Sequence, residues 1–289
     1  MPISVNTNMA SLTAQNSLNS ASTSMNRAME RLSTGYKINS SKDDAAGMAV
    51  STKLSYKLSC LSVAKDNGQM GSSLLNTTEG VYGVLQSNLQ RVRDLTEQAA
   101  NGTYGSDSML AITSEVEARL EEISRLANST EFNGQYLLNG SIDHSINLQL
   151  GITSSKDSVI ELPEDLFKKA TTTALFNITA GSNITKLVKA SYQNDTTART
   201  FLKDIDKAIA TVTDRITTTG GIQQRIIAAT EAITVMSDNM TSAVGLIQDA
   251  DIAAESTNYI KYQILQQTST AMLSAANQAP ALALSLIGG

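Results

Sequence analysis

Apolar residues recur along most of this chain in steps of three and four, and this spacing constrains the fold more than any other feature. The clearest seam consists of Leu202, Ile205, Ile209, Val212 and Ile216. Such steps keep apolar side chains on one face of a helix that packs in coiled-coil fashion. The seam is interrupted over 217–223, where Gly220 and Gly221 lie, and then resumes. Because each glycine costs a helix up to ~1 kcal/mol relative to alanine, we expect one long helix or two nearly collinear helices with a weak point there.

The first half of the chain has the same spacing. Its seam residues are Val50, Leu54, Leu58, Leu61, Met70, Leu74, Val81, Val84, Leu85, Leu89, Val92, Leu95 and Ala99, followed after a break at 101–106 by Ile112, Val116, Leu120, Ile123 and Ala127. The last of these helices is expected to end near Phe132-Asn133-Gly134. Proline, the residue that breaks helices most reliably, occurs only at Pro2, Pro163 and Pro280. The sequence therefore predicts a mainly α fold with three or four long helices that share a seam.

Both ends of the chain continue the helical pattern on a narrower face, rich in Ser, Thr, Asn, Gln and Ala. Leu18, Met25 and Leu32 mark it near the start, and near the end it is marked by Ile260, Ile264, Leu265 and Met272, with further apolar residues from 282 to 287. So little apolar area cannot offset an ordering entropy of roughly 1 to 2 kcal/mol per residue. We expect both ends to be disordered in the monomer and to be completed by something outside the chain.

The stretch from 141 to 195 has a different pattern. Ile146, Leu148 and Leu150 alternate with polar residues, and the segments SVIELP and ITAGSN are typical of short strands and turns. Helical spacing fades and the content of Thr, Ser and Asn rises. This stretch is predicted to be a small, β-containing, surface-exposed insertion.

Most chemical functions find no support in the residues. The net charge is −5 without a dense Lys/Arg cluster, which argues against nucleic acid as a partner. One histidine, His144, cannot build a metal site or a catalytic triad with other histidines, and no nucleotide or metalloprotease motif occurs. We therefore expect no catalytic residue, no metal and no cofactor. Asp43 and Asp44 are interpreted as the start of a helix capped by Ser41.

Targeting signals are also missing from the sequence. The N-terminus lacks a basic and then apolar leader, and nowhere do ~18 apolar residues follow one another as a membrane helix requires. Cys60, the only cysteine, cannot form an internal disulfide and is expected to be a half-buried hydrophobe.

Several long motifs, in order, resemble those of bacterial flagellin. They are VNTNMASLTAQNSLN, RAMERLSTGYKINSSKDDAAGMAVSTKL, NTTEGVYGVLQSNLQRVRDLTEQAANGT, EFNGQYLLNG, DADIAAES and ILQQTSTAMLSAANQAPALALSL. The resemblance covers about 1–140 and 195–287. It departs from the usual family pattern at Gly245-Leu246, at Gln267-Thr268, at Cys60 and at the final Gly288-Gly289.

The resemblance implies a long antiparallel helical bundle or coiled coil, with discontinuous N- and C-terminal halves and a small β-hairpin region. It divides the chain into an inner-core helix at 1–40, outer-core helices at 41–140, a short β-containing variable insertion at 141–195, an outer-core helix at 196–249 and an inner-core helix at 250–289. A large outer variable domain would be missing.

The resemblance further implies a structural subunit, not an enzyme, that self-assembles into the extracellular filament used for swimming. Export would occur unfolded through the flagellar type III system, with an export chaperone, a cap and hook-associated junction proteins as partners. The residues expected to make subunit contacts are Leu18, Met25, Leu32, Ile260, Ile264, Leu265 and Met272.

Recognition of the monomer by Toll-like receptor 5 is implied as well, through positions that match those of receptor-activating flagellins. These are Leu89, Gln90, Arg91, Leu95 and Glu115. The same surface could instead pack neighbouring subunits. Two other functions stay open: a hook-to-filament junction protein, and an enzyme displayed on a filament, for which 141–195 is short and lacks a metal-binding motif.

Overall fold

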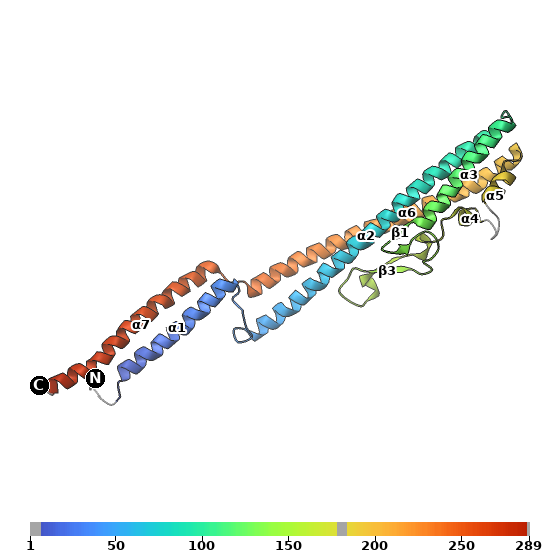
Figure 1. Ribbon diagram of the computed structural model, residues 1–289. Helices are drawn as coiled ribbons and strands as arrows, with labels where there is room; N and C mark the ends of the chain where they lie inside the picture. The colour runs from blue at the N-terminus through green and yellow to red at the C-terminus, as the bar shows by residue number, and fades with distance from the viewer. Residues whose placement is uncertain (1–6, 178–183, 288–289) are drawn as a thin grey trace. The chain divides into compact units, whose positions relative to one another are not determined.

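The computed structural model describes residues 7–177 and 184–287, with side chains described up to residue 278. The expected strand within 178–183 and the apolar side chains of 282–287 therefore lie outside the described part. Long helices dominate, so the predicted mainly α class is confirmed (Figure 1). In order, the elements are α1 (Met9–Thr34), α2 (Ala45–Ala99), α3 (Ser106–Ser129), β1 (Glu131–Phe132), β2 (Gln135–Tyr136), β3 (Ile146–Gln149), a 3-10 turn (Lys156–Ser158), β4 (Val159–Leu162), a second 3-10 turn (Glu164–Leu166), α4 (Thr172–Leu175), α5 (Ile184–Ser191), α6 (Asp195–Gln248) and α7 (Ile252–Ile287).

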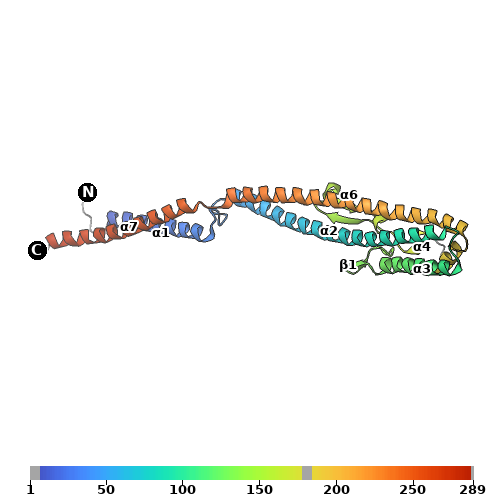
Figure 2. The same ribbon diagram turned by 90° about the horizontal axis from the view of Figure 1, so that it is seen from above.

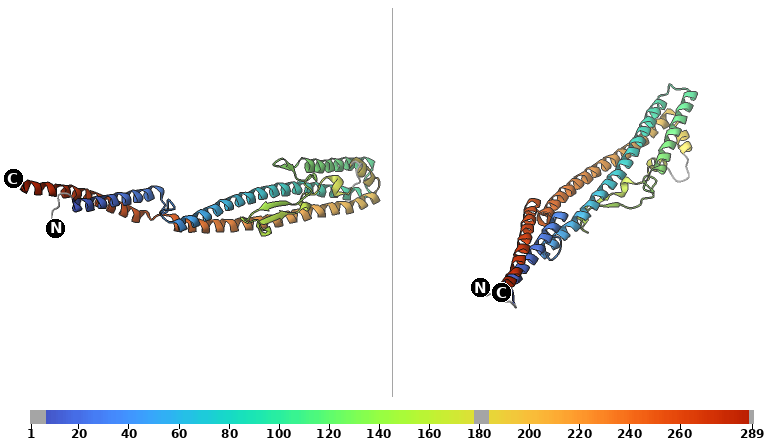
Figure 3. Two further views of the ribbon diagram at one scale, coloured as in Figure 1. Left: turned by 90° about the horizontal axis from the view of Figure 1, so that it is seen from below. Right: turned by 60° about the vertical axis from the view of Figure 1, so that its left-hand side comes forward.

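The chain forms two compact units, and α2 and α6 contribute to both. The first unit contains residues 1–58 and 238–289, so it brings together the two ends of the sequence. The second unit contains residues 59–237. Within the first unit, α1 and α7 lie side by side, as the blue and red helices of Figure 3 show.

The core of the second unit lies among α2, α3 and α6 (Figure 2). Many of their seam residues are fully or almost fully buried, as the spacing predicts: Leu85, Leu89, Val92, Val116, Leu120, Ile123, Ile205 and Val212. Other predicted seam residues are not: Leu202, Ile209 and Ile216 are half-buried, and Met70 and Val84 are 58% and 47% exposed. Polar pairs at the rim fix α2 antiparallel to α6. Arg93 donates to Asp206 at 2.8 Å, and Gln223 donates to Asn76 at 2.9 Å.

The weak point expected at 217–223 does not interrupt the helix, because α6 passes through both glycines. Thr219 is fully buried, and its hydroxyl donates to the carbonyl of Arg215 at 2.7 Å, so the polar atom is satisfied inside the helix. Ile222 and Ile226 are buried on the following turns. Tertiary packing thus outweighs the low helix propensity of Gly220 and Gly221.

The end of the third long helix differs from the expectation. The helix α3 stops at Ser129, and the residues around Asn133-Gly134 form the hairpin β1–β2, with Phe132 paired to Gln135. Asn133 and Gly134 both have positive φ, 51° and 77°. A two-residue turn with positive φ at both positions suits the twist of a hairpin, and Asn-Gly is its preferred sequence.

The stretch from 141 to 195 contains the antiparallel hairpin β3–β4, in which Ile146 pairs with Leu162, so the strand expected in SVIELP is confirmed. The expectation that this stretch is merely surface-exposed is wrong. Much of it belongs to the core of the second unit, because Ile160, Leu162, Leu166, Phe167, Ala170, Val188 and Tyr192 are buried. The alternation was visible in the sequence, but the surface on which its apolar face packs was not.

A polar clasp holds this stretch against the long helices. The buried hydroxyl of Tyr82 donates to the carbonyl of Leu166 at 2.7 Å. Arg215 donates to the Tyr82 oxygen at 3.2 Å and to the carbonyl of Lys168 at 2.9 Å. Burial raises the pKa of Tyr82, and the nearby Arg215 guanidinium opposes that rise.

We predict that Gly151→Ala destabilises the second unit. A Cβ at this position would lie 2.8 Å from the backbone Cα of Ser158, so the hairpin must move apart, at a cost of about 1–3 kcal/mol. The measurement is chemical denaturation followed by circular dichroism. The matched control is Gly80→Ala in α2, where a Cβ meets nothing within 4 Å, and this change should stabilise by up to ~1 kcal/mol. Equal stability of the two variants would contradict the packing described for β3–β4.

Candidate functional site

The pair of helices formed by the two chain ends is the candidate site. Where α1 faces α7, the buried residues of α1 are Ala14, Ala21 and Ala28, spaced by seven. On α7, Ser269 is buried. Small side chains bring the helices together but bury little apolar area, so this seam contributes much less than the Leu/Ile/Val seam of the second unit.

Hydrogen bonds define where both helices begin. The Asn8 side chain accepts from the amide of Ser11 at 3.1 Å, and the Asp251 carboxylate accepts from the amides of Ala253 and Ala254 at 2.9 and 3.1 Å. Asn8 also donates to the carbonyl of Ala276 at 2.7 Å, which ties the start of α1 to α7. The Asx residues at these positions thus satisfy helix amides that would otherwise lack partners.

A short antiparallel bridge joins the segment that leaves α1 to the segment that enters α7. Tyr36 pairs with Asp249, the amide of Lys37 donates to the carbonyl of Gln248 at 2.8 Å, and the amide of Ala250 donates to the carbonyl of Gly35 at 2.9 Å. Gly35 has φ 76°, a left-handed conformation that ends α1. The two ends of the chain are therefore held in register.

The start of α2 corrects one expectation from the sequence. Ser41 is exposed and does not cap the helix; the cap is Asp44, whose carboxylate accepts from the amides of Ala46 and Gly47 at 3.0 and 2.9 Å. Asp43 instead holds the preceding loop. Desolvation works against its ionisation, but hydrogen bonds from Ser40 and Asn39, with the charge of Arg31, leave the pKa of Asp43 below its ordinary value.

The residues expected to make subunit contacts divide into two groups. Leu18, Met25 and Leu32 on α1 are half-buried. The four expected contact residues on α7 are 44 to 62% exposed: Ile260, Ile264, Leu265 and Met272. Sequence reasoning missed further exposed apolar residues in this unit: Met9, Leu12, Tyr36, Leu246 and Ile252. The spacing of Met9 and Leu12, three apart, was a signal that could have found two of them.

A groove of about 700 Å³ runs between α1 and α7. Its lining residues are Met9, Ala10, Thr13, Ala14, Ser17, Leu265, Thr268, Ser269, Met272 and Ala276. This groove and the exposed α7 residues give the unit an apolar surface that its own two helices leave open, the kind of surface that marks an interaction site.

The positions matched to receptor contacts do not form one exposed surface. Leu89 and Leu95 lie in the core of the second unit, so no partner can reach them in this fold, whereas Gln90 and Arg91 are exposed. Arg91 donates to Glu115 at 2.9 Å, and this hydrogen bond raises the pKa of Arg91 and lowers the pKa of Glu115. The helical spacing of Leu89 and Leu95 predicts that both leucines are buried, and the same spacing predicts that Gln90 and Arg91 face outward.

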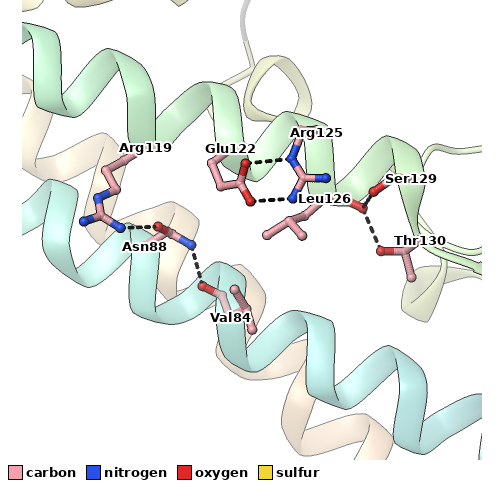
Figure 4. A network of polar contacts seen from close by, with 8 residues as sticks. All are labelled: Val84, Asn88, Arg119, Glu122, Arg125, Leu126, Ser129 and Thr130. Atoms are coloured by element: carbon pink, nitrogen blue, oxygen red, sulfur yellow. Dashed lines mark hydrogen bonds and ion pairs between the residues drawn. The ribbon is translucent and has the colours of Figure 1, made fainter.

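Polar contacts continue along α3 beside this pair (Figure 4). Arg119 donates to the Asn88 side chain at 3.3 Å, and Asn88 donates to the carbonyl of Val84 at 3.0 Å. Arg125 binds Glu122 through two hydrogen bonds, at 2.7 and 2.6 Å. The polar side chains of this face therefore already bind one another.

No group of three or more His, Cys, Asp or Glu residues that could hold a metal occurs among the described residues. His144 is exposed and forms a hydrogen bond with its neighbour Asp143 at 3.0 Å, and this bond lowers the pKa of Asp143. Among the described helices, none is long and apolar enough to cross a membrane.

Comparison with known proteins identifies the family. Residues 5–143 match the bacterial flagellin N-terminal helical region, and residues 202–287 match the bacterial flagellin C-terminal helical region. The chain is 33% identical to a flagellin of Halalkalibacterium halodurans over 98% of this chain and 99% of that protein. It is 31% identical to polar flagellin F of Vibrio parahaemolyticus, with full coverage of both chains.

A solved structure described as a putative flagellar hook-associated protein from Vibrio parahaemolyticus shares the fold, with a TM-score of 0.60 at 16% identity over 71% of this chain and 99% of that one. The paired helical ends and these matches define a helical structural protein of the bacterial flagellum. Within that class, the chain belongs to the bacterial flagellin family, whose members build the extracellular flagellar filament.

We predict that Asp44→Ala destabilises the first unit by about 1 kcal/mol, because two amides at the start of α2 lose their acceptor. Asp44→Asn keeps a side-chain oxygen at the cap and should lose much less. Ser41→Ala should have no measurable effect. Hydrogen exchange at the amides of residues 46–50 reports the change locally, and a larger effect from Ser41→Ala than from Asp44→Ala would contradict the assignment of the cap.

Proposed function

We propose that this chain polymerises through the exposed faces of α1 and α7, which neighbouring copies cover in the flagellar filament. The single observation that supports this is the contrast between the alanine seam inside the pair and the large apolar residues outside it. Ile260, Ile264 and Met272 are more than half exposed, whereas the buried residues of α1 are all alanines. At about 25 cal/mol per Å² of apolar surface, covering these side chains stabilises the pair far more than its own seam does.

The groove is lined by Leu265 and Met272 of the apolar face of α7, but Ile260 and Ile264 lie outside it. One copy can therefore offer Ile260 and Ile264 to the groove of another copy. A contact of this head-to-tail kind need not close into a ring, and when it does not close it grows a helical filament. A homopolymer of many copies follows. Hook-associated junction and cap proteins are proposed as partners at its ends, a proposal supported by the fold that this chain shares with a putative flagellar hook-associated protein.

The subunit is also proposed to serve swimming motility and to leave the cell unfolded through the flagellar type III exporter. A thin alanine seam is easily separated, which suits a chain that must be threaded. An export chaperone that covers the C-terminal segment would keep the exposed residues of α7 from associating in the cytoplasm. The family membership of the chain supports these steps.

The test is seeded polymerisation of purified subunits. Ile264→Asn is expected to raise the critical concentration by roughly tenfold or more, because an apolar side chain that is buried on assembly is replaced by a polar one. Ile264→Leu, the matched control, should stay within about twofold. Circular dichroism of both variants shows whether the monomer keeps its helices. Normal growth of long filaments by Ile264→Asn would refute the proposed interface.

A second proposed function is recognition of the free monomer by Toll-like receptor 5. The observation that favours it is the exposed pair Arg91–Glu115, with Gln90 next to it, because an exposed guanidinium and carboxylate offer directional contacts to a partner. Leu89 and Leu95 then act from the core by holding this stretch of α2 in place.

Receptor signalling by purified monomer tests this function. Arg91→Ala is expected to lower potency by roughly tenfold, the loss of one charge-assisted contact. Arg199→Ala, which removes an exposed arginine of α6 paired with Asp195, is the control and should leave potency unchanged. Indistinguishable signalling by the two variants, or no signalling by the unmodified monomer, would rule the function out.

A further inference from the structure

Two methionines from opposite ends of the sequence line the groove between α1 and α7. Met9 lies in the first turn of α1 and Met272 lies in α7, and both side chains are 62% exposed. Around them the groove is lined mainly by small or apolar residues, among them Ala10, Ala14 and Leu265. The thioether sulfur is soft and accessible in both cases, which is the condition under which methionine is oxidised.

We propose that Met9 and Met272 form an oxidation-sensitive modification site that controls whether the subunit can assemble. The inference rests on the proposed function, in that it takes the groove to be covered by a second copy of the chain. The reactant is hydrogen peroxide. A sulfur lone pair attacks one peroxide oxygen, so that the S–O bond forms as the O–O bond breaks. The proton on the attacked oxygen passes to the departing oxygen, which leaves as water. The sulfur is oxidised by two electrons and the peroxide is reduced by two.

The groove is poorly equipped to receive a sulfoxide. The new oxygen is a hydrogen-bond acceptor, but three of the four hydroxyls that line the groove already donate to helix carbonyls. Thr13 donates to Met9 at 2.8 Å, Ser17 donates to Thr13 at 3.0 Å, and Thr268 donates to Ile264 at 2.8 Å. In the free subunit, water binds the sulfoxide oxygen. Once a neighbour covers the groove that water is lost, and an unpaired buried acceptor opposes association.

The other exposed methionines provide internal controls. Met70 on α2 is 58% exposed and Met236 on α6 is 45% exposed, so peroxide reaches both. Both belong to the second unit, and neither residue lines the groove. Oxidation at Met70 and Met236 should therefore change the mass of the subunit without preventing assembly.

The experiment treats the full-length monomer with hydrogen peroxide, removes the peroxide, and then seeds polymerisation. Three proteins are compared: the unmodified chain, the double variant Met9→Leu/Met272→Leu, and the control Met70→Leu/Met236→Leu. Leucine conserves the volume of methionine and resists oxidation. We expect treatment to raise the critical concentration of the unmodified chain and of the control by roughly tenfold, and to leave the Met9→Leu/Met272→Leu subunit nearly unchanged. Methionine sulfoxide reductases should restore assembly of the treated chain.

A second measurement requires no variant. The treated, unmodified chain is separated into assembled and unassembled fractions, and the sulfoxide at each methionine is quantified by mass spectrometry. Sulfoxide at Met9 and Met272 should be concentrated in the unassembled fraction, with Met70 and Met236 oxidised equally in both.

Three results would overturn the inference: equal distribution of the Met9 and Met272 sulfoxides, normal assembly of subunits shown to carry them, or equal sensitivity of the Met9→Leu/Met272→Leu variant. Each can occur while the untreated Ile264→Asn subunit still fails to polymerise. Failure of this inference is therefore distinguishable from failure of the proposed function.

Discussion

The alanine seam between α1 and α7 is the interaction on which the character of this molecule depends. Ordering the backbone of α1, which has 26 residues, costs roughly 1–2 kcal/mol per residue. Burial of the small side chains of Ala14, Ala21 and Ala28 offsets little of this cost. The caps at Asn8 and Asp251 fix where the two helices begin, and the bridge between Tyr36 and Asp249 fixes their register. These polar contacts do not add buried apolar area. The pair therefore has its large side chains available for other molecules, which is what a subunit of a polymer requires.

The second unit is organised in the opposite way. Its three long helices bury leucine, isoleucine and valine side chains among them, and residues 141–177 cover one side through Leu162, Leu166 and Phe167. The clasp formed by Tyr82 and Arg215 binds the backbone of that segment, so it is fixed even where its sequence is polar. A unit with a core of large apolar side chains thus accompanies one whose helices meet along a seam of alanines.

The sequence predicted the helices well because their seams are long and regular: each of Ile112, Val116, Leu120, Ile123 and Ala127 is buried as the spacing requires. It could not show which partner each seam meets, so the packing of 141–195 became clear only in the fold. The burial of Leu89 and Leu95 agrees with their seam spacing and argues against the receptor contacts that the resemblance implies for them. The sequence also could not decide between two possible caps of similar energy at the start of α2. Ser41 and Asp44 are both good caps, and only the backbone conformation selects Asp44. For the candidate site, periodicity located α7 correctly, but not the groove that two helices create together.

The antiparallel bridge between Tyr36 and Asp249 joins residues that are 213 positions apart in the chain. Contacts of such separation close a very long loop, and they form late compared with neighbouring helices. During synthesis the first helix therefore emerges from the ribosome long before its mate exists. A factor that binds the nascent N-terminal segment can therefore act on it while almost the entire message is being translated.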